Sequence, residues 1–268
     1  MYKRKLYKSN MKKYILFILL FSVVTIHAQT EVKAFKKGEW LKFKISYSNF
    51  LNAGNATMEV RETKNNGNDV FHVVGKGRTT GVISWFFKVR DNYQTYFYKE
   101  SLQPYRFIRK INEGGYTKNK EILFNQTSKK ATVKDYKHNT EKQYATNNNV
   151  QDMLSTLYYL RNQDLSKMKA GDETTLTMFF DETNYKFKLR LLGREIIRTK
   201  FGKIAAAKFR PIVQEGRVFK ENESLTVWVS DDENKIPLRI KASLAVGSMR
   251  VDLNAYKGLA NPFPIIFN

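Results

Sequence analysis

The feature that most constrains the fold is an alternation of apolar and polar residues, with a period of two, along most of the chain. In the stretch WLKFKISY, which begins at Trp40, apolar residues alternate with lysine and serine. The same pattern recurs in ATMEVRET, DNYQTYFYKE, PYRFIRKIN, YKFKLRLLG, LTVWVSDD and MRVDLNAY. Because successive side chains of a β-strand point to opposite faces, each stretch predicts a strand with one buried face.

Clusters of Asn, Gly and Asp separate these stretches, at residues 65–69, 112–115 and 147–149. Such residues tolerate the backbone conformations that tight turns require. Many short strands joined by turns favour an antiparallel sheet that curls or closes to bury its apolar face. The sequence therefore predicts a mainly β protein, with a curved antiparallel sheet or a half-barrel around an apolar interior.

Residues 150–162 depart from the alternation and predict an amphipathic helix packed against the sheet. The apolar residues there follow helical spacing, at Val150, Met153, Leu154, Leu157 and Tyr158. Asn149 is the predicted N-cap, and Asp152 lies in the first turn, where a negative charge suits the helix dipole. The helix either plugs one side of a single β-rich domain, residues 29–268, or joins two β halves of it.

The segment TTGVISWFFKVRDNY is the second departure, because it contains three consecutive aromatic residues. Neither a strand nor a helix turns three adjacent side chains to one face, so the segment predicts a short helix, a buried strand or a mobile loop. Basic residues flank the aromatic ones, a combination that suits an anionic lipid or membrane surface as well as an ordinary lid over a core. The candidate ligand-binding residues are Trp85, Phe86, Phe87, Arg78, Lys88 and Arg90.

The N-terminus has the pattern of an export signal, which we assign to residues 1–28. Basic residues precede an apolar run of 13 residues, 14–26, which is too short to favour a membrane-spanning helix. Translation starts at either Met1 or Met11. The chain contains no cysteine, so it has no lipid-modified cysteine, disulfide or thiol nucleophile. We expect a soluble periplasmic protein that is not a lipoprotein; an uncleaved membrane anchor is the alternative.

The net positive charge of the chain indicates which classes of binding partner it favours. The formal net charge is +22, and the leader carries only six of the 47 basic residues. A basic surface favours anionic partners such as an anionic lipid or an envelope polymer, and it permits peripheral contact with a membrane. Small exported proteins without such a partner are often basic too. Strand alternation sends aromatic and basic residues to opposite faces, whereas nucleic-acid binding needs both on one face, so no nucleic-acid partner is predicted. The oligomeric state is left open.

No sequence motif for catalysis or metal binding occurs. His72 lies in a strand-like run and His138 in a turn, and neither has a metal-ligand spacing beside it. The chain also lacks the GxSxG, Walker and GxGxxG motifs. We therefore predict no catalytic residue, no metal site and no cofactor.

The acidic stretch SDDENK near the C-terminus joins two alternating runs. Asp231 and Asp232 are adjacent, so a strand would send their side chains to opposite faces. In a turn, the same carboxylates would accept hydrogen bonds from backbone N–H groups. The sequence predicts a turn here, with a metal site or a catalytic carboxylate as the alternatives.

Four stretches, taken in order, resemble a family of exported bacterial proteins, Domain of Unknown Function 3108. They are GEWLKFKISYSNFLNAGNATMEV, VRDNYQTYFYKESLQPYRFIRKINEGGY, VQDMLSTLYYLR and VWVSDDENKIPLRI. The resemblance implies a β-rich envelope protein, and it brings no established activity or catalytic residue with it. Recurrent motif positions of unknown role are matched by Asp152, Arg161, Trp228, Asp231 and Asp232.

These observations favour a non-enzymatic binding or envelope-maintenance protein. A cavity between sheet and helix would hold an apolar or anionic lipid-like ligand; a fully packed core without a cavity fits the same residues. One alternative is a hydrolase acting on an envelope polymer through Asp152, Asp231 or Asp232. Another is a structural protein that binds a partner through the apolar tail GLANPFPIIFN and an open sheet edge.

Overall fold

The structure is a computed structural model that describes residues 32–48, 51–214, 225–244 and 246–267. The predicted leader and its cleavage point lie outside these residues. The strands are β1 (Trp40–Tyr47), β2 (Leu51–Asn65), β3 (Asn68–Thr79), β4 (Arg90–Tyr98), β5 (Pro104–Glu113), β6 (Tyr116–Asn125), β7 (Lys130–Asp135), β8 (Thr140–Ala145), β9 (Glu173–Phe180), β10 (Thr183–Thr199), β11 (Gly202–Gln214), β12 (Leu225–Ser230), β13 (Pro237–Ser243), β14 (Ser248–Lys257) and β15 (Ile265–Ile266). The helices are α2 (Ile83–Phe86) and α3 (Met153–Arg161).

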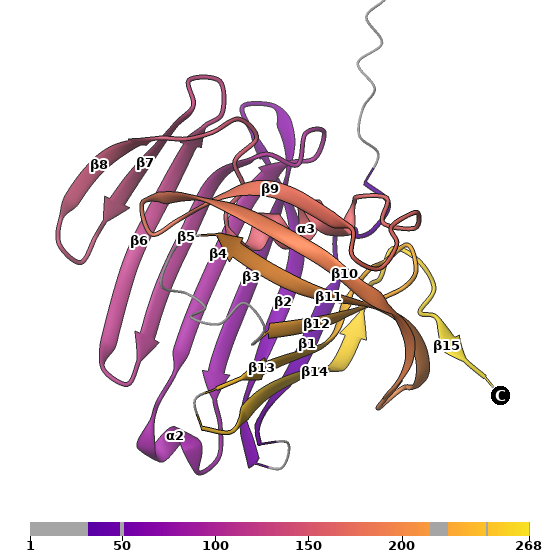
Figure 1. The fold of residues 1–268 in the computed structure, drawn as a ribbon. Helices are drawn as coiled ribbons and strands as arrows, with labels where there is room; N and C mark the ends of the chain where they lie inside the picture. The colour runs from indigo at the N-terminus through magenta and orange to yellow at the C-terminus, as the bar shows by residue number, and fades with distance from the viewer. Residues whose placement is uncertain (1–31, 49–50, 215–224, 245, 268) are drawn as a thin grey trace, which may run out of the picture. The chain divides into compact units, whose positions relative to one another are not determined.

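The strands form one antiparallel sheet, in the order β8-β7-β6-β5-β4-β3-β2-β1-β14-β13-β12-β11-β10-β9, with β15 paired to β11. Strands that are neighbours in this order are also consecutive in sequence, except at the centre, where β1 pairs with β14. The sheet therefore consists of two meanders, β1–β8 and β9–β14, which meet along β1 and β14 (Figure 1).

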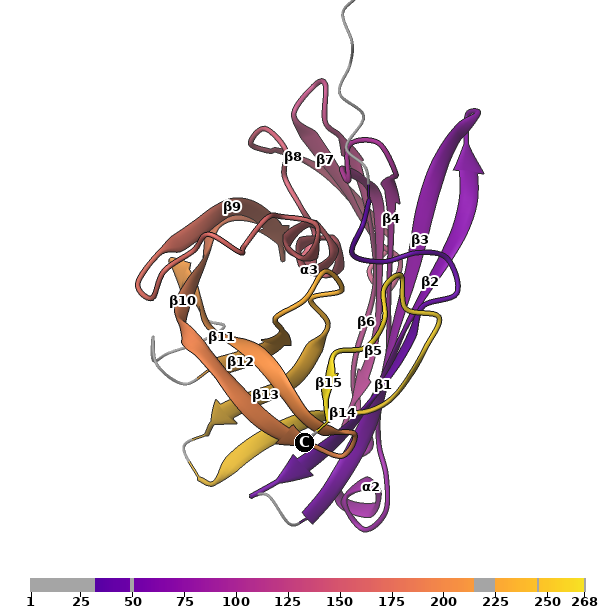
Figure 2. The ribbon, with the colours of Figure 1, turned by 90° about the vertical axis from the view of Figure 1, so that its right-hand side faces the viewer.

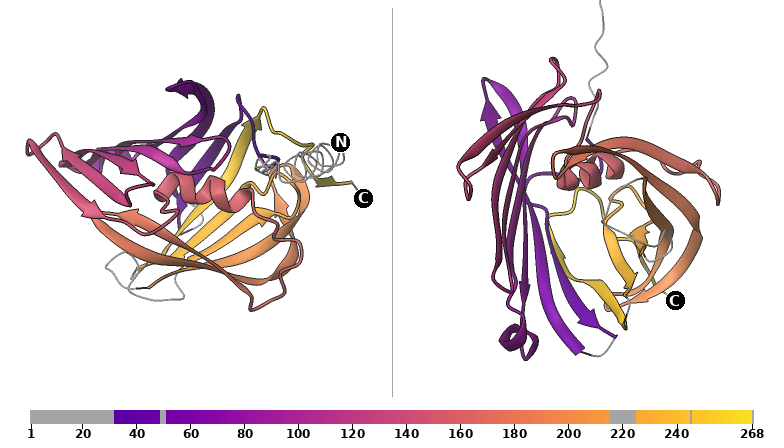
Figure 3. Two further views of the ribbon diagram at one scale, coloured as in Figure 1. Left: turned by 90° about the horizontal axis from the view of Figure 1, so that it is seen from above. Right: turned by 60° about the vertical axis from the view of Figure 1, so that its left-hand side comes forward.

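The two meanders differ in curvature, and α3 lies between them. The first meander is a broad layer, whereas the second curls back so that β9 and β10 face that layer across the helix (Figures 2 and 3). The sheet does not close into a barrel, because β8 and β9 remain its two ends. The predicted fold class, a curved antiparallel sheet with a helix packed against it, is confirmed.

The core joins the helix to both meanders. Tyr158 of α3 is fully buried, and its ring lies 4.7 Å from that of Phe35 within a cluster that includes Phe97 of β4. Phe179 of β9 packs with residues of β5–β7, among them Phe124, so the second meander reaches across to the first.

The C-terminal tail packs as a strap. The Phe263 ring lies 4.3 Å from the Tyr256 ring of β14 and 5.5 Å from the Phe201 ring, measured between centroids. Beyond it, β15 adds to the edge of β11.

The helix α3 begins later than its apolar spacing suggests. The Asp152 carboxylate accepts hydrogen bonds from the backbone N–H groups of Leu154 and Ser155, so Asp152 is the N-cap, and the predicted N-cap Asn149 is wrong. Asn149 instead has a φ of 52° in the loop before the helix. Among the described residues, no helix is long and apolar enough to cross a membrane.

Candidate ligand-binding cavity

A cavity of about 460 Å³ lies between α3 and the curled meander. Leu157 and Leu160 line it from the helix, Phe187 from β10, Phe209 from β11 and Val227 from β12. Small-molecule pockets in proteins have volumes of roughly 300–1,000 Å³. The cavity is therefore large enough for an organic ligand, and most of its wall is apolar.

The wall contains few polar groups, and the described ones differ in how they are bonded. The hydroxyl of Thr156 is buried and has no hydrogen-bond partner. Lys235 lines the cavity, and among the described residues its ammonium group makes no hydrogen bond or ion pair. A buried polar group without a partner is uncommon in native structures, so Thr156 is a candidate for contact with a polar part of a ligand. Lys235 is only half-buried, and it is a candidate because its positive charge lies at the cavity wall.

Arg161, by contrast, is fully bonded within the protein although it also borders the cavity. Its guanidinium Nη1 and Nη2 each lie 2.7 Å from a carboxylate oxygen of Glu39, which is also buried. Its remaining bonds go to the backbone carbonyls of Ala34 and Asn234. Arg161 thereby ties the end of α3 to the N-terminal segment and to the β12–β13 turn.

The acidic stretch at residues 230–235 is a turn, and it positions Lys235. Asp232 accepts hydrogen bonds from the Ser230 hydroxyl, at 2.6 Å, and from the Asn234 amide, at 2.7 Å. It also accepts one from the backbone N–H of Lys235, which has a φ of 46°. The Asp232 carboxylate therefore holds the left-handed backbone that turns Lys235 to the cavity wall.

The other recurrent acidic positions are likewise engaged within the fold. Asp152 is fully buried, and its second carboxylate oxygen accepts a bond from the Thr95 hydroxyl at 2.5 Å. Burial raises the pKa of Asp152 to about 6, against the opposing effect of its hydrogen bonds. Asp231 forms an ion pair with Arg194, at 3.1 Å. The structure does not bring Asp231 and Asp152 into a shared hydrogen-bond network.

Trp228 belongs to the core beside the cavity. It is buried in the cluster that contains Leu41 and Leu238, and its indole Nε1 donates to Glu195 at 2.5 Å. Its neighbours Val227 and Val229 line the cavity, so the alternation of β12 places Trp228 behind the wall.

A two-residue turn between β9 and β10 fastens the curled meander to the first one. Asp181 and Glu182 both have positive φ, 42° and 72°, which is the type I′ geometry that glycine and asparagine adopt most readily. The Asp181 carboxylate pairs with Arg109 at 2.6 Å, and the Glu182 carboxylate pairs with Lys120 at 2.7 Å. These pairs connect the hairpin that covers the cavity to β5 and β6.

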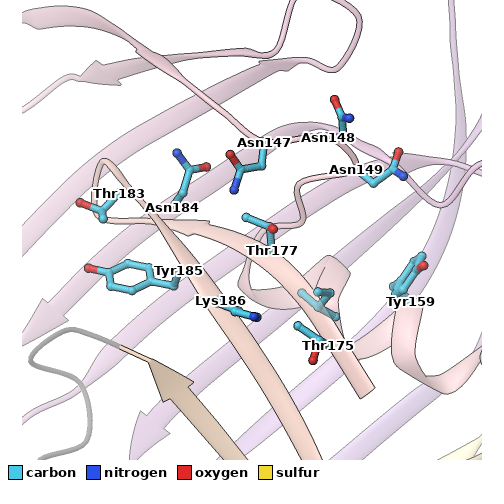
Figure 4. A pocket seen from close by; sticks show the side chains of 11 residues that line it. Asn147, Asn148, Asn149, Tyr159, Thr175, Thr177, Thr183, Asn184, Tyr185 and Lys186 are labelled. Atoms are coloured by element: carbon cyan, nitrogen blue, oxygen red, sulfur yellow. The ribbon is translucent and has the colours of Figure 1, made fainter. Parts of the chain in front are cut away.

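A polar hollow of about 640 Å³ adjoins the same hairpin (Figure 4). The loop residues Asn147, Asn148 and Asn149 line it, together with Thr177 of β9. Tyr185 of β10 lines both this hollow and the apolar cavity. The tyrosine side chain thus stands where the polar surface meets the apolar interior.

None of the six predicted ligand-binding residues lines the cavity. Trp85 and Phe86 lie in or beside α2, each 82% exposed. Four of the six, Arg78, Trp85, Lys88 and Arg90, come together instead in a separate groove of about 910 Å³. The predicted residues thus lie away from the cavity, and their role in ligand binding stays a prediction.

His72 and His138 both have partners within the fold. His72 hydrogen-bonds Gln94 at 2.9 Å and stacks on Tyr96, and burial lowers the pKa of its ring. His138 lies 2.9 Å from the Asp135 carboxylate in a turn. Within the ranges that the structure covers, no three His, Asp or Glu side chains gather to hold a metal ion.

Thr156 and Lys235 were not singled out from the sequence. Thr156 lies three residues after Met153 and four before Leu160, so helical spacing alone places it on the same side as these lining residues. Lys235 gave no such signal, since its direction depends on the turn that Asp232 stabilises.

Comparison with known proteins gives one matching family and several similar solved structures. A family model described as "Protein of unknown function (DUF3108)" matches residues 42–254. No curated protein matches the chain in sequence. A β-barrel-like protein of a domain of unknown function, DUF1849, from Brucella abortus has a TM-score of 0.55 and 10% identity, over 84% of this chain and 99% of its own. This likeness concerns the fold alone.

Two further solved structures are more distant. A predicted exported protein with a YmcC-like fold from Bacteroides fragilis has a TM-score of 0.36 and 8% identity, over 84% of this chain and 99% of its own. A predicted lipoprotein from Parabacteroides distasonis has a TM-score of 0.37 and 11% identity, over 85% of this chain and all of its own.

Proposed function

This chain belongs to the family described as "Protein of unknown function (DUF3108)", and we propose that it is an exported, non-enzymatic protein that binds an amphipathic lipid-like molecule. The observation that carries the proposal is the apolar cavity of about 460 Å³ between α3 and β9–β13. The binding site is this cavity, and the bound molecule is an acyl chain or a similar apolar group with one acidic end.

The apolar wall supplies the affinity. Side chains such as Leu157, Leu160, Phe187 and Val227 present hydrocarbon to the cavity from the helix and from two strands. Each methylene group that moves from water into such surroundings contributes roughly 0.8 kcal/mol. A chain of several methylene groups would therefore bind without any specific polar contact.

The polar wall residues select the end of the ligand. Lys235 offers a positive charge that no described residue neutralises by an ion pair, and Thr156 offers a hydroxyl without a partner. Lys235 is half-buried, and an ammonium group that is partly removed from water attracts an anionic partner more strongly than one in bulk water. These groups support a carboxylate or phosphate at one end of the ligand.

The polar hollow beside Tyr185 provides a route between solvent and cavity. Tyr185 lines both spaces, and its neighbours in the hollow are asparagine and threonine side chains that bind water readily. A rotation of this one aromatic side chain would connect the two spaces. We therefore place the mouth of the cavity at Tyr185.

A hydrolase is the weaker alternative because of how the acidic residues are bonded. The carboxylates of Asp152 and Asp232 each accept three hydrogen bonds from the chain itself. Asp231 is paired with Arg194. Such carboxylates act as caps and turn supports, and we assign them no catalytic role.

The central test blocks the cavity. Val227→Trp would fill it from β12, whereas Val246→Trp makes the same change at a site that is 77% exposed. Native mass spectrometry of protein isolated from its own cell envelope should show a retained lipid for the wild type and for Val246→Trp. We expect the retained mass to disappear in Val227→Trp. A bare wild-type chain, with no binding of cis-parinaric acid in solution, would favour a packed interior instead.

A second experiment tests the selection of an anionic end. Lys235→Gln should weaken binding of cis-parinaric acid, which carries a carboxylate, about tenfold, because the removed contact is charged. Binding of the neutral probe N-phenylnaphthylamine should not change. Equal loss for both probes would assign Lys235 to the shape of the wall and not to recognition of charge.

A further inference from the structure

The segment around α2 exposes an aromatic tip, by which we mean Val82, Trp85, Phe86 and Phe87. Trp85 and Phe86 are each 82% exposed, and Val82 and Phe87 are more than half exposed. Isolated apolar residues are normal on a protein surface, but four within six positions form a contiguous patch. The tip lies within the connection between β3 and β4, at the margin of the first meander (Figures 1 and 3).

The fold holds this tip outward. Phe87 rests against Gly114 in the β5–β6 turn so closely that a methyl group on Gly114 would lie 2.4 Å from the ring. The backbone N–H of Gly114 also bonds the carbonyl of Lys88 at 2.9 Å, and Ser84 closes the turn through the carbonyl of Gly81 at 2.6 Å. The exposure of Trp85 and Phe86 is therefore a property of a fastened segment.

A cationic groove lies directly beside the tip. It has a volume of about 910 Å³, and Trp85 forms part of its wall. Its basic lining residues are Lys42, Lys76, Arg78, Lys88 and Arg90, whereas Asp91 is the single acidic one among the described lining residues.

The basic residues of this groove form no ion pair within the described chain, although Lys76, after Arg61, contributes to lowering the pKa of the neighbouring Glu59 carboxyl. Lys42, Lys76, Lys88 and Arg90 make no ion pair there, and Arg78 bonds the neutral amide of Asn55 at 3.3 Å. Like charges that gather without counter-charges repel one another, and an anion bound among them relieves this repulsion. The groove thus has the charge of a site for an anionic group.

The groove faces away from the cavity. Lys42 of β1 lines it, while Leu41 and Phe43 on either side are buried in the core, so strand alternation places Lys42 on the outer face of the sheet. In β3, Lys76 lines the groove, while its neighbour Gly75 faces Leu154 of α3. The groove and the cavity therefore lie on opposite faces and can act independently.

We propose that the aromatic tip and the cationic groove form a docking surface for an anionic phospholipid membrane. The indole of Trp85 and the ring of Phe86 would lie at the level of the lipid head groups, where aromatic side chains are favoured. The groove beside them would bind the lipid phosphates. This docking surface does not depend on the proposed cavity ligand.

Vesicle co-sedimentation tests the proposal. Vesicles of equal parts phosphatidylglycerol and phosphatidylcholine supply the anionic surface, and pure phosphatidylcholine vesicles serve as the neutral one. The groove variant, Lys88→Gln with Arg90→Gln, removes two charges of the groove. Its control, Lys130→Gln with Lys241→Gln, removes two exposed charges elsewhere, from β7 and β13. The tip variant, Trp85→Ala with Phe86→Ala, removes two aromatic side chains of the tip. Its control, Ile196→Ala with Phe267→Ala, removes two apolar side chains elsewhere that are 61% and 85% exposed.

We expect the wild type to bind the anionic vesicles, with a blue shift of tryptophan fluorescence that Trp85→Phe abolishes. A cation near an anionic membrane strengthens binding about fivefold, so the groove variant should bind roughly 30-fold more weakly. The tip variant should also lose binding, and both control variants should retain it. Equal losses in the groove and control charge variants would reduce the effect to net charge and overturn the proposal. Failure of the wild type to bind anionic vesicles at low salt would do the same.

Discussion

At the scale of single residues, the buried carboxylate of Asp152 shows how local bonding and burial oppose each other. Its N-cap bonds to Leu154 and Ser155 favour the charged form, whereas full burial favours the neutral form and raises the pKa to about 6. The folded protein therefore binds this proton more tightly than the unfolded chain does. Asp152 contributes stability that is fully present below pH 3.8 and is lost as the pH rises through about 6.

Asp152→Asn should remove this dependence. Asparagine caps helices as well as aspartate does, and its side chain carries no charge at any pH. We expect the free energy of unfolding of the variant, relative to wild type, to rise by up to about 3 kcal/mol between about pH 4 and pH 7. Urea denaturation of both proteins at the two pH values measures it. A relative stability that does not change with pH would mean that Asp152 stays charged in the folded state.

Glu39 is the second residue with a sharp expected effect. Glu39→Gln would leave the buried guanidinium of Arg161 without its counter-charge, which destabilises proteins by about 3–5 kcal/mol. Glu59→Gln removes the acid of an exposed pair with Arg61, also at 2.7 Å, and should change stability by less than about 1 kcal/mol. Chemical denaturation compares the two. Similar small losses would show that the Arg161 pair contributes little.

The residue pattern predicted which face of a strand or helix is buried better than it predicted the role of an individual side chain. Asp152, Arg161 and Trp228 were singled out from the sequence, but their tasks as buried cap, tether and core side chain depend on residues that lie far away in the chain. These are Thr95, Glu39 and Leu41. The helix spacing likewise pointed to Asn149 as the cap. It could not reveal that Asp152 has better-placed acceptors for the helix N–H groups.

At the scale of elements, the β9–β10 hairpin is the part of the cavity wall whose attachment can be changed most cleanly. Its turn uses Asp181 and Glu182 at positive φ, where Asn-Gly would be less strained. Asp181→Asn with Glu182→Gly should preserve the turn while it removes the ion pairs to Arg109, Lys118 and Lys120.

We expect this double variant to release a bound probe faster, since the tip of the hairpin loses its ion pairs to the first meander and is held there mainly by the packing of Phe179. Stopped-flow fluorescence with cis-parinaric acid measures the dissociation rate. Glu173→Gln is the control, because Glu173 pairs with Lys188 and Arg190 within the same hairpin. An unchanged rate in the double variant would place the mobile part of the wall elsewhere.

The sequence predicted the strands and the helix better than it predicted their tertiary arrangement. Period-two alternation depends only on which face of each strand is buried, so the curved antiparallel sheet was predictable, as was the helix before residue 162. The sequence left open whether a cavity or a packed core lies between sheet and helix, because the volume there depends on how far β9–β13 curl away from α3. The pairing of β1 with β14 was also beyond prediction, since nothing in either strand specifies its partner.

At the scale of the whole molecule, ligand binding and stability should be linked. The cavity wall includes α3 and β9–β13, so a ligand that binds there binds only the folded chain. At a hundredfold excess over its Kd, such a ligand stabilises the fold by about 2.7 kcal/mol. For a chain of this length, that corresponds to a rise in Tm of roughly 5–10 °C. Thermal unfolding with and without cis-parinaric acid tests this, and Val227→Trp should show no shift.

The pairing of β1 with β14 affects the order in which the sheet forms during synthesis. Every other neighbouring pair in the main strand order is close in sequence and can form as soon as its second strand has been synthesised. The second edge of β1 has to wait until residues 248–257 emerge, about two hundred positions later. During that interval β1 presents unpaired backbone groups to any passing strand, the situation from which aggregation starts. Completion of the sheet is therefore a late event in folding, and the nascent chain needs protection at its first strand.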